Sequence, residues 1–112
     1  MGKRIENLRD YGIDFEEVMK RFVNDEAFYL ECLDMFFQDD SMERLKESIE
    51  KKDTNAAFEA AHTLKGIVGN LGLKKLFEKV SMLVEELRLN KFDNANSMYQ
   101  EIRSEYEVIK QL

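Results

Sequence analysis

The sequence is short of the residues that break helices, cross-link chains or bind metals. Its 112 residues include no proline, no tryptophan, five glycines, one cysteine and one histidine. The single cysteine, Cys32, excludes an internal disulfide and favours a reducing compartment. The single histidine, His62, excludes zinc sites built from several histidines and the paired Glu-x-x-His motifs of di-iron bundles. The scarcity of proline and glycine favours a helical chain.

Charge and length exclude further classes of protein. The chain has 23 acidic and 17 basic side chains, a net charge of −6, which argues against nucleic acid or an anionic membrane as the main partner. No run of apolar residues approaches the ~18 that a membrane span requires. The N-terminal segment lacks the apolar run of a secretory signal, so we expect a cytoplasmic protein. A chain of this length fits one domain, and we expect residues 1–112 to form it.

Apolar residues recur at helical spacing through most of the chain. Helix starts are indicated by capping residues, namely Asp14, Asn24 or Asp25, Asp40 or Ser41, and Asp53 or Thr54. The helices expected from these signals cover about 14–22, 25–38, 41–52, 54–70, 73–87 and 94–110. Several connections are short, so sequential neighbours should be antiparallel. The predicted fold is all-α, an up-and-down four-helix bundle with an additional short N-terminal helix or helices.

The helix expected over 54–70 contains glycines that lower its stability and therefore need another explanation. Gly66 and Gly69 fall in its interior, where each costs about 1 kcal/mol relative to alanine. Gly72 follows its end, the usual position of a left-handed cap. At 100° per residue, one face collects the apolar residues Ala57, Ala60, Leu64, Ile67, Val68 and Leu71. His62 points away from that face, so a buried core histidine is not expected.

The neighbours of His62 indicate a nucleophile with open access. Gly66, at i+4, leaves the ring open to a bulky group, and Lys65, at i+3, places an ammonium near any anion carried on the ring. Gly69 widens the cleared surface, and Phe58 offers an apolar rim. On this face the glycines are not expected to serve close helix packing. A free imidazole, with a pKa near 6.5, is mostly neutral at pH 7 and can attack an electrophile.

The run AHTLKGIVGNLGL, residues 61–73, resembles the signature of histidine-containing phosphotransfer (HPt) domains. In that signature Leu-Lys-Gly occupies the second to fourth positions after the histidine and a glycine the tenth. The matching residues here are His62, Leu64, Lys65, Gly66 and Gly72. The similarity extends over about residues 10–110. It implies a free-standing phosphorelay protein of two-component signalling, which accepts a phosphoryl group from the aspartyl phosphate of one receiver domain and passes it to the aspartate of another.

The resemblance also implies roles for individual residues. His62 would be the phosphorylated residue, Lys65 its electrostatic partner and Gly66 the source of steric access. Phe58, Gly69 and Asn70 are the predicted partner-binding residues. Expected partners are response-regulator receiver domains and, as a further candidate, a hybrid sensor kinase. The chain itself is expected to be a monomer. We expect no cofactor or metal in the chain itself, because the receiver supplies Mg²⁺, and no nucleic acid or membrane as partner.

The sequence departs from the family in one place. Many members carry a Leu-Glu pair in the following helix, and in some of them the Glu orients the imidazole. Here the corresponding pair is Leu83-Val84, with Glu85 one position late, so no orienting carboxylate is predicted. The chain also lacks a Walker loop and a second histidine, which favours a phosphocarrier over an enzyme. The alternative function is a non-phosphorylated helical adaptor that binds receivers or other signalling partners.

Overall fold

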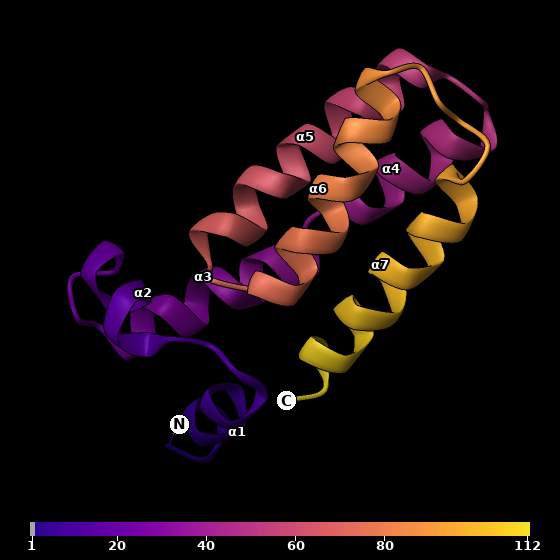
Figure 1. Ribbon diagram of the computed structural model, residues 1–112. Coiled ribbons are helices and arrows are strands. Elements are labelled where there is room, and N and C mark those ends of the chain that lie inside the picture. The colour runs from indigo at the N-terminus through magenta and orange to yellow at the C-terminus, as the bar shows by residue number, and fades with distance from the viewer. Residues whose placement is uncertain (1) are drawn as a thin grey trace.

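A computed structural model describes residues 2–112, and these residues form α-helices joined by short connections (Figure 1). The helices are α1 (Gly2–Tyr11), α2 (Phe15–Arg21), α3 (Glu26–Gln38), α4 (Ser41–Glu50), α5 (Thr54–Asn70), α6 (Lys74–Arg88) and α7 (Ala95–Lys110). Residues 2–112 contain no strand, so the all-α prediction is confirmed. None of their helices combines the length and the apolar character needed to cross a bilayer.

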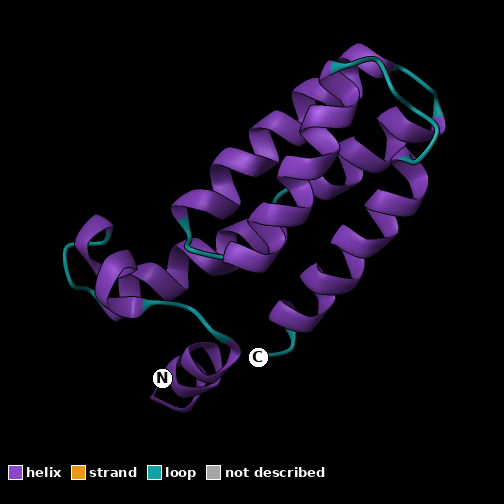
Figure 2. Cartoon of the chain, in the orientation of Figure 1, coloured by secondary structure: helices purple, strands orange, loops and turns teal. Residues whose placement is uncertain are grey.

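Helices α4 to α7 form the bundle. α5 packs against both α4 and α6, α6 packs against α7, and α7 returns to α4, which closes the arrangement. Figure 2 shows the α4–α5 and α6–α7 connections at one end of the bundle and the α5–α6 connection at the other. Sequential helices are therefore antiparallel, as predicted. The molecule is elongated along the bundle, with extents of 42 × 23 × 21 Å.

Aspartate side chains fix the starts of three helices. The carboxylates of Asp14, Asp25 and Asp53 each accept a hydrogen bond from the backbone N–H three residues later, at 3.3, 3.0 and 3.1 Å. Such caps satisfy backbone donors that have no partner inside the helix. At α4 the carboxylate of Asp40 instead accepts from Arg44 Nε at 3.0 Å. The expected helix bounds agree with the observed ones to within about two residues, the usual uncertainty of helix ends.

The end of α5 depends on Gly72, whose φ is +74°. The N–H of Gly72 donates to the carbonyl of Gly69 at 3.2 Å, and the N–H of Leu73 donates to that of Val68 at 3.0 Å. This pair of bonds is the Schellman motif, which needs a residue in the left-handed conformation. A Cβ at Gly72 would lie 2.3 Å from Cγ2 of Val18 in α2. The predicted capping role of Gly72 is confirmed, and the glycine also lets α2 approach closely.

Helix α1 was not among the helices expected from the sequence, the first of which begins near residue 14. Only Ile5 and Leu8 of its residues are buried, too few to produce a clear periodicity. Contacts with distant residues hold it in place. Arg4 forms an ion pair with Asp34 of α3 at 2.6 Å, and the Tyr11 hydroxyl donates to Glu105 of α7.

Candidate functional site

α5 presents His62 on the side that faces away from the core. The buried residues of the helix are Ala57, Ala61, Leu64 and Val68, whereas the His62 side chain is exposed. The helix phase read from the sequence is therefore confirmed. Within residues 2–112 the imidazole forms no hydrogen bond, and the group it contacts is the ring of Phe58. The two ring centroids are 5.8 Å apart and the planes are inclined by 28°, a stacked arrangement.

His62 opens onto a shallow hollow of about 430 Å³ that lies between α5, α6 and the end of α2. Its lining residues are Arg21, His62, Lys65, Gly66, Gly69, Asn70 and Phe77. Five of the six predicted site residues are thus brought together, while Phe58 stays outside the hollow and packs on the histidine ring. The charged side chains of this lining, Arg21 and Lys65, are both cationic. In a chain of net charge −6, the surface beside the histidine is locally suited to an anion.

Gly66 and Gly69, which both lie within α5, have different surroundings. A Cβ at Gly66 would meet no heavy atom within 4 Å, so this glycine leaves open space one turn beyond His62. A Cβ at Gly69 would lie 3.0 Å from Cδ1 and Cε1 of Phe77 in α6. The prediction that neither glycine serves close helix packing is therefore wrong for Gly69. The helical wheel placed Gly69 correctly beside the histidine, but it contained no information about where α6 approaches.

Lys65 and Phe77 form one wall of the hollow. The Lys65 ammonium lies 5.8 Å from the centroid of the Phe77 ring, and both side chains are half-buried. A contact of this kind contributes about 0.5–1 kcal/mol at a partly exposed site. It keeps the lysine against the rim of the hollow that His62 shares.

Arg21 is a residue of the site that the sequence did not reveal. Its Nε donates to the Asn70 carbonyl at 3.1 Å and its Nη2 to the Gly69 carbonyl at 3.5 Å. Its Nη1 lies 3.8 Å from a carboxylate oxygen of Glu17. A cation beside the last carbonyls of a helix is favourable because those groups carry the negative end of the helix dipole. No local pattern predicts the contact, because it joins residues 49 positions apart.

Tyr29 also holds the C-terminal end of α5. Its hydroxyl donates to the Leu71 carbonyl at 2.7 Å, and the side chain is fully buried between the rings of Phe15 and Phe22. Burial raises the pKa of Tyr29 well above its usual value. The hydrogen bond satisfies another terminal carbonyl of the helix that carries His62.

A chain of contacts leads from α6 to the other side of the histidine. The Arg88 guanidinium lies 5.2 Å from the centroid of the Phe58 ring, and its Nε lies 3.4 Å from a carboxylate oxygen of Glu85. Glu85, the acid one position late in the family pattern, is thus paired with Arg88. No carboxylate within residues 2–112 forms a hydrogen bond with His62.

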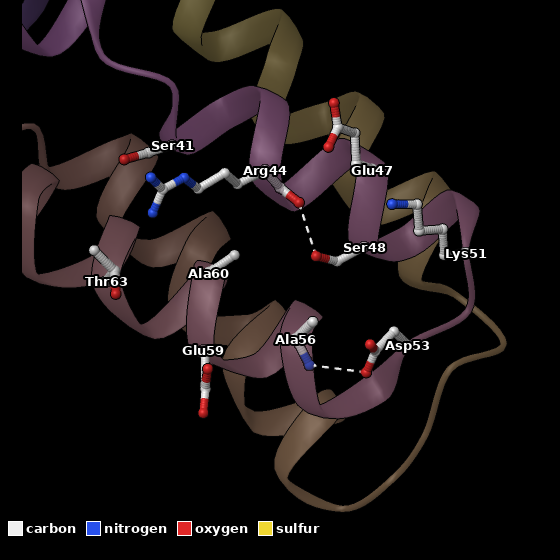
Figure 3. Close-up of a pocket in the computed structure, with 10 residues that line it drawn as sticks. All are labelled: Ser41, Arg44, Glu47, Ser48, Lys51, Asp53, Ala56, Glu59, Ala60 and Thr63. Atoms are coloured by element: carbon white, nitrogen blue, oxygen red, sulfur yellow. Dashed lines mark hydrogen bonds between the residues drawn. The ribbon is translucent and has the colours of Figure 1, made fainter.

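A second hollow, of about 370 Å³, lies between α4 and α5 (Figure 3). Its lining mixes cations and carboxylates, among them Arg44, Lys51, Glu47 and Glu59. The polar interactions drawn there are helical, since Ser48 donates to the Arg44 carbonyl and Asp53 accepts from the Ala56 N–H. Residues 2–112 contain no group of three or more His, Cys, Asp or Glu side chains that could hold a metal ion.

The comparison with protein families agrees with this geometry. The family model for the Hpt domain matches residues 31–112, which run from within α3 to the end of the chain and include the motif around His62. No curated protein and no solved structure gives a significant match. The resemblance expected for residues 10–30 lies outside the matched region and stays a prediction. Hpt domains are phosphocarriers that perform histidine phosphotransfer in phosphorelays, where they interact with receiver domains. From a match over most of its length, we conclude that this chain belongs to the Hpt domain family.

Proposed function

We propose that His62 accepts a phosphoryl group from the aspartyl phosphate of a receiver domain and passes it to the aspartate of another receiver. The observation that supports this most directly is the setting of the imidazole. It is exposed on α5, it faces a hollow whose charged residues are cations, and open space surrounds Gly66 one turn away. A dianionic group carried on the ring would have room and favourable charge there.

The proposed transfer is a displacement at phosphorus. The lone pair of one imidazole nitrogen attacks the phosphorus atom, and an N–P bond forms while the bond from phosphorus to the aspartyl oxygen breaks. The electron pair of the broken bond leaves with the aspartate, which returns to its ionised form. The other ring nitrogen keeps its proton until solvent removes it. The second transfer reverses these steps on a different receiver, and each receiver contributes the Mg²⁺ that offsets charge on the phosphoryl oxygens.

Lys65 is proposed as the electrostatic partner of the phosphoryl group. Its contact with Phe77 is worth about 0.5–1 kcal/mol. A hydrogen bond between the ammonium and a phosphoryl oxygen is charge-assisted and worth about 1.5–3 kcal/mol. Once His62 carries the phosphoryl group, the Lys65 ammonium should therefore leave the Phe77 ring and bind a phosphoryl oxygen. Because the lysine stem is flexible, this exchange requires no movement of α5.

The remaining predicted residues are proposed to meet the receiver. Gly66 provides access for its active-site loops, and Gly69 and Asn70 extend the same side of α5 along the hollow. The backbone carbonyls of Gly69 and Asn70 are occupied by Arg21. Asn70 therefore has its side chain, rather than its backbone, available for a partner.

Transfer from a radiolabelled, phosphorylated receiver domain tests the proposal. Label should appear on the wild-type chain in an acid-labile, base-stable form, should be absent from His62→Gln, and should leave again when an unphosphorylated second receiver is added. His62→Gln should retain the helical circular dichroism of the wild type. Receiver binding with no transfer in either direction would favour the adaptor function instead, and label that persists in His62→Gln would refute the assignment of the residue.

A further inference from the structure

We propose that Phe58 is the positioning residue for His62 and that Arg88 holds Phe58 in place. This inference rests on the proposed function and concerns what orients the imidazole in a chain that lacks an orienting carboxylate. Phe58 of α5 and Arg88 of α6 would orient the histidine by stacking, whereas hydrogen bonds orient it in many other sites.

The orientation of the imidazole depends on its contacts. A histidine ring can turn about two side-chain bonds, and without contacts it would sample several orientations. His62 forms no hydrogen bond within residues 2–112, whereas Phe58, one helical turn earlier, lies against it at 5.8 Å and 28°. Residues at i and i+4 of a helix are neighbours on its surface. Under this proposal, the phenyl ring bounds the imidazole on one side and favours the inclined, offset stack that is observed.

A ring contact and a hydrogen bond leave different atoms of the imidazole free. A stacked ring approaches the imidazole from the side of its face, whereas the lone pair of a ring nitrogen lies in the plane of the ring and points outward from its edge. Stacking can therefore fix the plane of the ring without occupying either nitrogen. A carboxylate would instead hold one nitrogen by a hydrogen bond and select one tautomer. The stack orients the nucleophile while it leaves both tautomers available.

Phe58 is half-buried and packs against the core, and α6 adds a contact on its exposed side. Because α6 is antiparallel to α5, its last turn lies beside the first half of α5 and brings Arg88 to 5.2 Å from the Phe58 ring. Glu85, one turn earlier in α6, holds the same guanidinium at 3.4 Å. Glu85 thus acts at a distance from the histidine, through Arg88 and Phe58.

Phe58 could instead serve only as an apolar rim for a bound receiver, the role predicted from the sequence. The two roles give different kinetics. A rim is needed for affinity, and Phe58→Leu preserves an apolar side chain there, so the transfer rate at saturating receiver should change little. A positioning ring must be flat, so the same substitution should lower the saturated rate and leave the half-saturating receiver concentration unchanged.

The experiment measures phosphoryl transfer from a phosphorylated receiver domain as a function of its concentration. For Phe58→Leu the saturated rate should fall about two- to tenfold, the range expected when one aromatic contact is lost. Phe58→Tyr keeps the ring and should restore the rate to within about twofold of wild type. Arg88→Gln should cause a smaller fall of the same kind. Phe37→Leu and Arg103→Gln are matched controls, since they alter a half-buried ring and an aromatic-stacked arginine on α3 and α7.

A spectroscopic measurement on the unphosphorylated protein makes the test independent of transfer. Ring currents from Phe58 should shift the imidazole carbon-bound protons upfield in the wild type and in Phe58→Tyr, and Phe58→Leu should remove that shift. Absence of any shift difference, or a Phe58→Leu variant with an unchanged saturated rate, would overturn the inference. If the wild-type protein itself accepts no label, the proposed function fails, whereas a wild type that transfers normally alongside an unaltered Phe58→Leu refutes only the positioning role.

Discussion

Substitutions of Gly66 should change the stability of the fold and the access of a receiver to His62 in opposite directions. Gly66 lies well inside α5, where glycine is less favourable than alanine by about 1 kcal/mol. A Cβ at this position would meet no heavy atom within 4 Å, so nothing in the fold opposes a larger residue. We therefore expect Gly66→Ala to stabilise the protein by roughly that amount. For a domain of about 110 residues, 1 kcal/mol corresponds to a rise in Tm of about 4 °C.

Gly66→Leu should be about as stable as Gly66→Ala, because leucine is nearly as good a helix former. Its side chain, however, would extend into the open space beside His62 that a receiver must enter. Since a small displacement of reacting groups can lower a rate by orders of magnitude, we expect phosphoryl transfer to slow by about tenfold or more. The two variants together should show stability gained and transfer lost at the same position.

Thermal unfolding followed by circular dichroism, together with transfer from a phosphorylated receiver domain, measures both effects. Gly69→Ala is the comparison variant, because it makes the same substitution at a crowded position beside the end of α5. The new Cβ would lie 3.0 Å from Phe77, so its gain in Tm should be smaller than that of Gly66→Ala. The reasoning about access is refuted if Gly66→Leu folds stably and transfers at the wild-type rate.

Three further predictions concern the stability of the folded chain. Gly72→Ala should lower the free energy of unfolding by about 2 kcal/mol or more, since it strains a residue at φ +74° and meets Val18 at 2.3 Å; in denaturant unfolding the same substitution should cost less when it is made in a Val18→Ala background, and an equal cost in the two backgrounds would contradict the clash. Val23, 78% exposed at φ +48°, is a β-branched residue in a left-handed conformation, so Val23→Asn should raise the free energy of unfolding by about 1 kcal/mol, and an unchanged or lower value would disprove the strain. Because burial raises the pKa of Tyr29, its proton is bound more tightly in the folded state, so stability should fall as the pH rises above about 10; a fall that is as steep in Tyr29→Phe would assign it to other groups.

The fold was largely predictable because its signals are local. Asp14, Asp25 and Asp53 mark helix starts by a hydrogen bond to a residue three positions away. The buried and exposed faces of α5 follow from its own apolar pattern. Helix α1 could not be delimited in this way, because contacts with distant parts of the chain hold it. Ile5 and Leu8 are buried in the core, and Arg4 and Tyr11 bind residues of α3 and α7. A pattern within ten residues carries no record of such contacts.

The candidate site was predictable to the same extent and for the same reason. His62, Lys65 and Gly66 lie on one face of one helix, so their spacing alone brings them together. Gly66 and Gly69 looked alike in the sequence, and the approach of Phe77 from α6 distinguishes them. Arg21 was not identified, because the contacts that place it in the hollow depend on how α2 meets the end of α5. What sequence reasoning missed is therefore the part of the site that other helices supply.

The distribution of contacts along α5 bears on how one histidine could serve two partners. The C-terminal end of the helix is held by the hydrogen bonds from Arg21 and Tyr29 and by the close approach of Val18 to Gly72. His62 itself has no hydrogen bond within residues 2–112 and lies against one aromatic ring. The backbone that presents the nucleophile is therefore more firmly held than the nucleophile. A carrier of this kind would offer every receiver the same docking surface, while small adjustments of the imidazole accommodate donor and acceptor. Loss of Arg21 or Tyr29 should then weaken the docking of a receiver, whereas loss of Phe58 should slow transfer within the docked complex.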